Sequence, residues 1–168
     1  MKAPITDRLF FAALLDPDTA GSLADLARRL RLGHELTGQP QAADRFHVTL
    51  LTTYEGQGVP DNAVTVAKAL AGRVTMPPFR VVFDRALSFP GGAFVLCGGE
   101  GVAGLDLLQQ KFGATQRRYE PHLTLLRDRH LVPEHPIQPV AWTVREFVLV
   151  HSLVGKTRHI HLDRWTLK

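Results

Sequence analysis

The sequence has little cysteine and no long apolar run. Cys97 is the only cysteine among the 168 residues, which excludes an intrachain disulfide and a cysteine-based metal cluster. The apolar run at residues 9–15 is too short to span a membrane. An Asp-Pro-Asp segment at residues 16–18 follows it, where a signal peptide would have small residues. We therefore expect a soluble, cytoplasmic protein.

Neither sign of charge dominates the chain. Lys and Arg together number 20 and Asp and Glu 16, so the net charge is +4 with the histidines neutral. This small basic excess is compatible with an anionic substrate but does not identify one. The chain also lacks low-complexity segments and linker-like segments, and its length favours one domain. We expect residues 1–168 to form a single domain.

Patterns typical of metal sites are missing as well. The chain has no Cys-rich segment, no His-Glu-x-x-His motif and no carboxylate-rich cluster. Five of the histidines show no consistent ligand spacing: His130, His135, His151, His159 and His161. His159 and His161 would share one face of a strand, so a weak metal site there is a minor alternative. We expect no cofactor and no required metal.

The chain does contain one short His-x-Thr motif twice, first as FHVTL and then as PHLTL. Side chains alternate between the two faces of an extended strand, so His47 and Thr49 share a face, as do His122 and Thr124. The apolar residues between them can pack into a core. Each copy therefore presents an imidazole and a hydroxyl to the same side of a sheet.

This repetition favours a catalytic pair. A single His-x-Thr motif in a strand is usually structural, but here both copies lie in alternating strand patterns and both follow a helical segment. Two histidines can divide the roles of acid and base near neutral pH. The hydroxyls of Thr49 and Thr124 can hold a phosphate between them.

Periodicity and turn residues predict a mixed order of strands and helices. Asp16 suits an N-cap and Pro17 the first helical position, and Gly33 and Gly113 suit helix ends. Beside the strand of the second motif, strands are expected at residues 8–15, 45–54, 74–89 with a break near 76–78, 93–97, 142–150 and 159–167; helices are expected at 17–33, 60–72 and 102–112, and a loop at 130–139.

The order strand, helix, His-x-Thr strand thus occurs twice, which suggests a divergent internal duplication. Two related halves packed about a pseudo-two-fold axis would bring equivalent strands face to face across a cleft. We expect the two His/Thr pairs to line that cleft.

These motifs resemble those of the two-histidine (2H) phosphoesterase superfamily, and within it the bacterial and archaeal RNA 2′,3′-cyclic phosphodiesterases, also called 2′-5′ RNA ligases. The most specific match is YEPHLTLLR at residues 119–127, and the segments RLFFA at 8–12, FVLV at 147–150 and RWTL at 164–167 also fit. The similarity covers most of the chain. It implies an α+β, bilobal fold, with antiparallel sheets in two pseudo-symmetric lobes around a central cleft and helices on the outside.

The resemblance implies metal-independent hydrolysis of 2′,3′-cyclic phosphate ends of RNA to 2′-phosphate ends, with weak reversal as a 2′-5′ ligase. His47 would then be the acid and His122 the base, and Thr49 and Thr124 would bind the phosphate. Two alternatives stay open: a phosphodiesterase for a small nucleotide such as an ADP-ribose cyclic phosphate, and a non-catalytic RNA-binding module. The expected partners are RNA ends or small cyclic-phosphate nucleotides, with no membrane, and we expect a monomer.

Arg127 is a further candidate for phosphate binding, because the family commonly has a basic residue there and a guanidinium suits bidentate contact. Strand alternation places it opposite His122 and Thr124, so we expect it to reach the cleft only if the strand bends or ends. Weaker candidates are a basic rim for an RNA end (Arg45, Arg117, Arg118, Lys156, Arg158) and two tyrosines that could stack on a base (Tyr54, Tyr119). Scattered surface charge and core packing are the simpler explanations for these.

Two departures from the family pattern are expected at the rim of the cleft. Residues 53–56 read TYEG where the family usually has a Phe-Leu-Gly-like run, and His159 stands where it usually has an aromatic residue. We expect both to affect the preferred substrate more than the chemistry.

Overall fold

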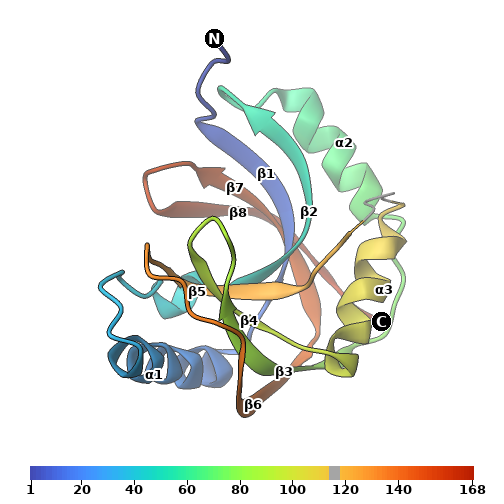
Figure 1. Cartoon of the computed structure of the whole chain (residues 1–168). Helices are drawn as coiled ribbons and strands as arrows, with labels where there is room; N and C mark the ends of the chain where they lie inside the picture. Colours follow the sequence, from blue (N-terminus) through green and yellow to red (C-terminus); the bar gives the residue numbers. More distant parts are fainter. Residues whose placement is uncertain (114–117) are drawn as a thin grey trace.

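The computed structural model describes residues 1–113 and 118–168, which form two four-stranded antiparallel sheets (Figure 1). The first sheet has the order β2-β1-β7-β8, with β1 (Asp7–Leu14), β2 (His47–Gly56), β7 (Glu146–Leu153) and β8 (Arg158–Thr166). The second has the order β5-β4-β3-β6, with β3 (Phe79–Ser88), β4 (Ala93–Cys97), β5 (His122–Arg127) and β6 (His135–Val144). The predicted bilobal α+β fold is confirmed.

Three α-helices lie on the outside of the sheets in the described residues (Figure 1): α1 (Pro17–Gly33), α2 (Asp61–Ala71) and α3 (Ala103–Lys111). Two short 3₁₀ helices, Ala43–Arg45 and Glu100–Val102, precede β2 and α3. Asp16 caps α1 as predicted, because its carboxylate accepts a hydrogen bond from the Thr19 N–H at 2.8 Å. None of these helices combines the length and the apolarity that a membrane crossing requires.

The predicted internal repeat is visible in the topology. The strands of the unit β1-α1-β2 belong to the first sheet, and those of the unit β4-α3-β5 belong to the second. Each motif strand is an edge strand of its sheet and pairs with the first strand of its own unit. Each of these two helices contacts the sheet of the other unit: α1 packs against β6 of the second sheet, and α3 packs against β2 of the first sheet as well as β3 of the second. The repeat therefore places the two motif strands in equivalent positions.

Prolines explain two differences between the predicted and the observed elements. Residues 130–139 were expected to form a loop, but β6 already begins at His135. Pro136 and Pro139 are tolerated there because β6 is an edge strand, where the missing N–H of proline breaks no ladder on the outer side. The predicted break near residues 76–78 is confirmed, because β3 begins at Phe79, after Pro77 and Pro78, and only the short strand segment expected before the break is not formed.

The strand predicted at residues 142–150 is in fact two strands. Only Arg145 separates β6 from β7, and at this residue the chain passes from the second sheet to the first. β6 buries Trp142 and Val144 on one face, whereas the central strand β7 is buried on both faces at residues 147–150, and no Gly or Pro marks the passage between them. Alternation alone could therefore not reveal the change of sheet.

Side chains of the central strands β1 and β4 alternate between one large core and a smaller buried cluster on the opposite face. Phe11 and Phe94 belong to one large buried core, which joins both sheets and all three helices. The opposite face of β1 carries a smaller buried cluster around Phe10, and the opposite face of β4 carries one around Val95. Truncation of a buried Phe typically costs about 3–5 kcal/mol, so these strands are strongly fixed.

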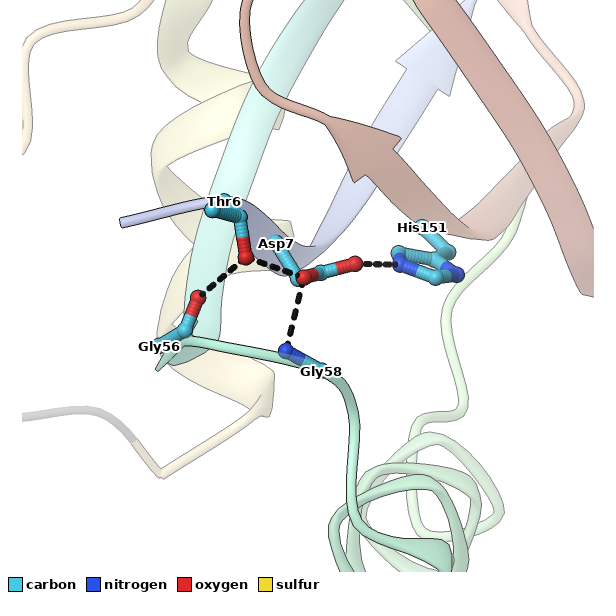
Figure 2. A network of polar contacts seen from close by, with 5 residues as sticks. All are labelled: Thr6, Asp7, Gly56, Gly58 and His151. Atoms are coloured by element: carbon cyan, nitrogen blue, oxygen red, sulfur yellow. Dashed lines mark hydrogen bonds and ion pairs between the residues drawn. The ribbon is translucent and has the colours of Figure 1, made fainter. Parts of the chain in front are cut away.

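A polar network fastens the outer end of the first sheet (Figure 2). The Asp7 carboxylate accepts hydrogen bonds from the Thr6 hydroxyl at 2.6 Å, the His151 Nε2–H at 2.7 Å and the Gly58 N–H at 2.7 Å. Led by the bond from Thr6, these contacts lower the pKa of Asp7 to about 2. The network joins the starts of β1 and of the loop after β2 to β7, which gives His151 a structural role.

Candidate active site

Each motif strand contains a β-bulge directly after its threonine. In β2 the pairing with β1 passes from Thr49 to Leu51, so Leu50 has no cross-strand partner. In β5 the pairing with β4 passes from Thr124 to Leu126 and leaves out Leu125 in the same way. An inserted residue shifts the alternation of side chains by one position. The residue three positions after each threonine therefore returns to the face of the histidine.

This bulge corrects the prediction for Arg127. Simple alternation placed Arg127 opposite His122 and Thr124, but beyond the bulge it shares their face and lines the same cleft. The equivalent residue of β2 is Thr52, which also lines the cleft and was not identified from the sequence. The only available signal was its equivalent spacing to Arg127.

The two motifs meet in one cleft of about 940 Å³. Its walls include all four motif side chains, His47, Thr49, His122 and Thr124. Further wall residues come from β1, from the loop before β2 and from the β7–β8 hairpin: Arg8, Phe10, Gln39, Pro40, Gln41, Arg45, Ser152, Thr157 and His159. The cleft is at the upper end of the range of about 300–1,000 Å³ that is typical of small-molecule sites.

The two histidines are held in the same tautomer by the same device. His47 Nδ1 lies 2.8 Å from the carbonyl oxygen of Arg45, and His122 Nδ1 lies 2.8 Å from that of Glu120. A carbonyl can only accept, so each Nδ1 carries a proton and donates it. Each Nε2 has no hydrogen-bond partner in the described residues and is available for proton transfer.

The surroundings of His47 are aromatic and basic. Its ring stacks on Phe10 at 5.2 Å between centroids and meets the edge of His159 at 5.3 Å. Burial lowers the pKa of His47, and the positive charge of Arg45 adds to this effect. The neutral imidazole is therefore favoured in the free protein. At the other motif, His122 meets the ring of Phe89 at 4.9 Å.

Arg45 and His159 form a pair beside His47. Arg45 Nη2 donates to His159 Nε2 at 3.0 Å, so the proton of neutral His159 resides on Nδ1. Burial, with the nearby His47 and Arg45, lowers the pKa of His159 to about 4. His159 Nε2 is thus occupied, and the described residues contain no group of three or more potential metal ligands.

Two side chains connect the lobes at the motif threonines. The Tyr119 hydroxyl, from the segment before β5, donates to the carbonyl oxygen of Thr49 at 2.8 Å. In return Gln41, from the segment before β2, donates through Nε2 to the carbonyl oxygen of Thr124 at 3.0 Å. Each motif is therefore held by the segment that leads into the other. Tyr119 also packs on the core, as the simpler explanation predicted, and burial raises its pKa.

The loop that carries Gln41 lies along β5 and forms one wall of the cleft. The Asp128 carboxylate accepts hydrogen bonds from the backbone N–H groups of Thr37 at 2.7 Å, Gly38 at 2.8 Å and His130 at 2.8 Å. These bonds, led by that from His130, lower the pKa of Asp128 to about 2. A methyl group at Gly38 would collide with the Arg127 carbonyl oxygen, so the loop requires glycine there.

The predicted basic rim is only partly present. Arg45 lines the main cleft, and Arg118 lines a smaller cavity of about 260 Å³ beside His122. Lys156, Arg158 and Tyr54 line neither cavity in the described part of the chain. Arg117 lies outside the described residues.

Comparison with known proteins decides the family. A model of the 2′-5′ RNA ligase superfamily matches residues 15–156. The RNA 2′,3′-cyclic phosphodiesterase of Escherichia coli (strain K12) is 30% identical over 176 residues, which cover 95% of this chain and 96% of that relative. The chain belongs to the 2′-5′ RNA ligase superfamily. Membership confirms the resemblance that the paired motifs indicated, and the chain is accordingly an enzyme of the phosphoesterase class.

Solved structures of other proteins have the same fold. Escherichia coli LigT complexed with ATP superposes with a TM-score of 0.76 at 29% identity, over 99% of each chain. A crystal structure of a phosphoesterase gives 0.77 at 28% identity, over 96% of this chain and 99% of that one. TT0787 of Thermus thermophilus, at 22% identity and a TM-score of 0.71 over 95% and 97%, supports the fold alone.

Proposed function

We propose that this enzyme hydrolyses 2′,3′-cyclic phosphate ends of RNA to 2′-phosphate ends, with His47 and His122 as its acid and base. One observation carries the proposal. Two imidazoles from pseudo-symmetric strands line one cleft, and each is held in the Nδ1–H tautomer by a carbonyl two residues earlier. Such a pair can act on opposite sides of a phosphorus atom.

The reaction needs one proton to leave and one to arrive. The base takes a proton from water as the water oxygen forms a bond to phosphorus. The bond from phosphorus to the ribose 3′ oxygen breaks, and the acid protonates that oxygen. The product carries a 2′-phosphate and a free 3′ hydroxyl, and the two histidines have exchanged protonation states. When the 5′ hydroxyl of a second RNA takes the place of water, its oxygen bonds to phosphorus, the bond to the ribose 3′ oxygen breaks and a 2′-5′ diester forms, which is the ligase reaction.

The hydroxyls of Thr49 and Thr124 donate hydrogen bonds to the non-bridging phosphate oxygens. Arg127, on the same face beyond its bulge, adds a bidentate cationic contact. Charge on these oxygens is stabilised by fixed donors in the transition state, which lowers the barrier. The chemistry is assigned to these side chains without a metal.

The resemblance assigns the acid role to His47, and the burial of this residue makes that assignment testable. An acid must be protonated, whereas burial lowers the pKa of His47 in the free protein. The negative charge of a bound phosphate must therefore raise that pKa again. The alkaline limb of the pH profile should then lie at lower pH for kcat/KM, which reports the free enzyme, than for kcat, which reports the complex. Coinciding alkaline limbs would contradict the acid role of His47.

The direct test uses a dinucleotide with a 2′,3′-cyclic phosphate end, with products separated by chromatography and assigned by phosphorus NMR. Wild-type protein should give the 2′-phosphate alone. An ADP-ribose cyclic phosphate assayed in parallel ranks the small-nucleotide alternative. Binding of the dinucleotide by folded wild-type protein without any turnover would reject the proposal in favour of an RNA-binding module.

A further inference from the structure

A partly buried positive charge lies next to the proposed catalytic pair. Arg45 is partly buried and lines the cleft, yet none of the ion pairs in the described residues includes it. Its Nε is buried and has no hydrogen-bond partner among those residues. A partly desolvated guanidinium with unused donors is costly unless an anion completes it. The position of Arg45 therefore points to a ligand that brings the anion.

His159 fixes the direction of this guanidinium. The imidazole accepts from Arg45 Nη2 at 3.0 Å, while its ring meets the edges of Phe10 at 5.6 Å and of His47 at 5.3 Å. These two ring contacts and the hydrogen bond together hold the imidazole beside Arg45. Because His159 is neutral near neutral pH, it orients the cation and leaves its charge uncompensated.

The other two arginines of the cleft already have a partner, either a carboxylate of the protein or the reacting phosphate. Arg8 forms a 2.6 Å ion pair with Glu55, which offsets its charge. Arg127 belongs to the proposed phosphate contacts together with Thr49 and Thr124. The two non-bridging oxygens of a cyclic phosphate accept about four hydrogen bonds, and the two hydroxyls and a bidentate guanidinium supply that number. The donors of Arg45 are therefore in excess of what the reacting phosphate can accept.

We propose that Arg45, oriented by His159, binds a second phosphate, the internucleotide diester on the 5′ side of the terminal nucleotide. The enzyme then prefers an RNA end with at least one internucleotide phosphate over a cyclic mononucleotide. This inference rests on the proposed function and names its substrate class. It also gives a reason for His159, since a Phe at this position would keep the ring packing but could not accept from Arg45.

The first test changes the substrate and leaves the protein unchanged. Three compounds are compared by kcat/KM: a diadenosine dinucleotide with a 2′,3′-cyclic phosphate end, the same compound with a neutral methylphosphonate linkage, and adenosine 2′,3′-cyclic phosphate. The charged dinucleotide should exceed the methylphosphonate by roughly 10- to 100-fold, as for loss of a charge-assisted hydrogen bond. Equal values for the two dinucleotides would overturn the second phosphate site.

The second test changes the protein and compares the ratio of kcat/KM for the charged dinucleotide to that for the mononucleotide. Arg45→Met should reduce this ratio roughly 10-fold or more, and Arg45→Lys should reduce it less. His159→Phe should reduce it mainly through KM, and His159→Gln, which keeps an acceptor, should retain more of it. Arg158→Met, an exposed neighbour on β8, removes the same charge outside the cleft and controls for general attraction of RNA.

The outcomes separate this inference from the proposed function. If Arg45→Met slows both substrates equally, Arg45 acts on the reacting phosphate and the second site is rejected. If wild-type protein turns over neither substrate, the proposed function fails instead. The site is then tested by calorimetric binding of diadenosine 2′-phosphate against its methylphosphonate analogue, and equal affinities would reject it. Melting curves of all variants show whether folding contributes.

Discussion

His47 and His122 occupy equivalent positions in the two lobes, but their neighbours differ. Both donate from Nδ1 to a carbonyl two residues earlier, and both precede a bulge. The pairing of the central strands makes Phe10 of β1 the counterpart of Ala93 of β4. A ring therefore stacks on His47 from a position that offers only a methyl group in the other lobe. The backbone repeat sets where the two imidazoles lie, and the side chains around them set their electrostatic environment.

The charged residues that flank the two motifs also differ between the lobes. Two residues before the histidine stands Arg45 in one lobe and Glu120 in the other. Three residues after the threonine stands Thr52 in one and Arg127 in the other. Each motif thus has one arginine, which precedes the histidine in the first lobe and follows the threonine in the second. A symmetric backbone with asymmetric charges suits a substrate whose two ends are chemically different.

The largest effect on turnover is expected from removing either of the two histidines. His47→Ala or His122→Ala should each lower kcat at least 10²–10⁴-fold, the usual contribution of acid–base catalysis. The double variant should be scarcely slower than either single one, because both groups serve one reaction. Thermal melts should stay close to wild type, and His130→Ala, an exposed histidine that lines neither cavity, serves as the matched control. A folded single variant with near wild-type turnover would refute the pair.

The next largest effect on turnover is expected from removing the hydroxyl of either motif threonine. Thr49→Val and Thr124→Val keep the shape of the side chain but remove a donor, which typically costs about 10²–10³ in rate. The loss should appear in kcat more than in KM. Unchanged steady-state kinetics in both variants would reduce the threonines to strand-forming residues.

A smaller effect is expected from the two contacts between the lobes. Tyr119→Phe and Gln41→Leu each remove one hydrogen bond to a motif carbonyl, worth about 0.5–1.5 kcal/mol, which corresponds to roughly a 2- to 10-fold fall in kcat. The two losses should be similar, because the contacts are reciprocal. Both variants should keep the wild-type fold by circular dichroism. If Tyr119→Phe alone has an effect, the lobes are not held symmetrically.

The smallest effect on turnover concerns two aspartates whose pKa values are lowered to about 2, Asp7 and Asp128. Such a group stabilises the fold above its unfolded pKa, near 3.9, and this contribution is lost as the pH falls toward about 2. Asp7→Asn and Asp128→Asn should each flatten the fall of Tm over that range. Asp128→Asn should also slow turnover, because Asp128 holds the cleft wall at Thr37 and Gly38, whereas Asp7 is remote from the motifs. Equal turnover in the two variants would show that the hydrogen bonds between Asp128 and this wall do not affect the reaction.

The sequence was sufficient for the paired motifs and most element boundaries, because alternation and caps are local signals, and the bilobal fold followed from the resemblance of the motifs to those of the 2H phosphoesterases. It was insufficient for Thr52 and misleading for Arg127, since a bulge depends on how two strands pair and leaves no local mark. The contacts of Gln41 and Tyr119 with the opposite lobe join residues 83 and 70 positions apart and are invisible to periodicity. Arg45 looked like surface charge because burial of a side chain depends on tertiary packing.

The central claim is that two histidines, and no metal, carry the reaction in one cleft. The most direct measurement is the pH dependence of kcat for the cyclic-phosphate dinucleotide in the presence of EDTA. One histidine must be neutral and the other protonated, so the profile should be bell-shaped, with both limbs within a few units of neutrality. Turnover that stops on chelation and returns with added divalent metal would contradict the two-histidine mechanism.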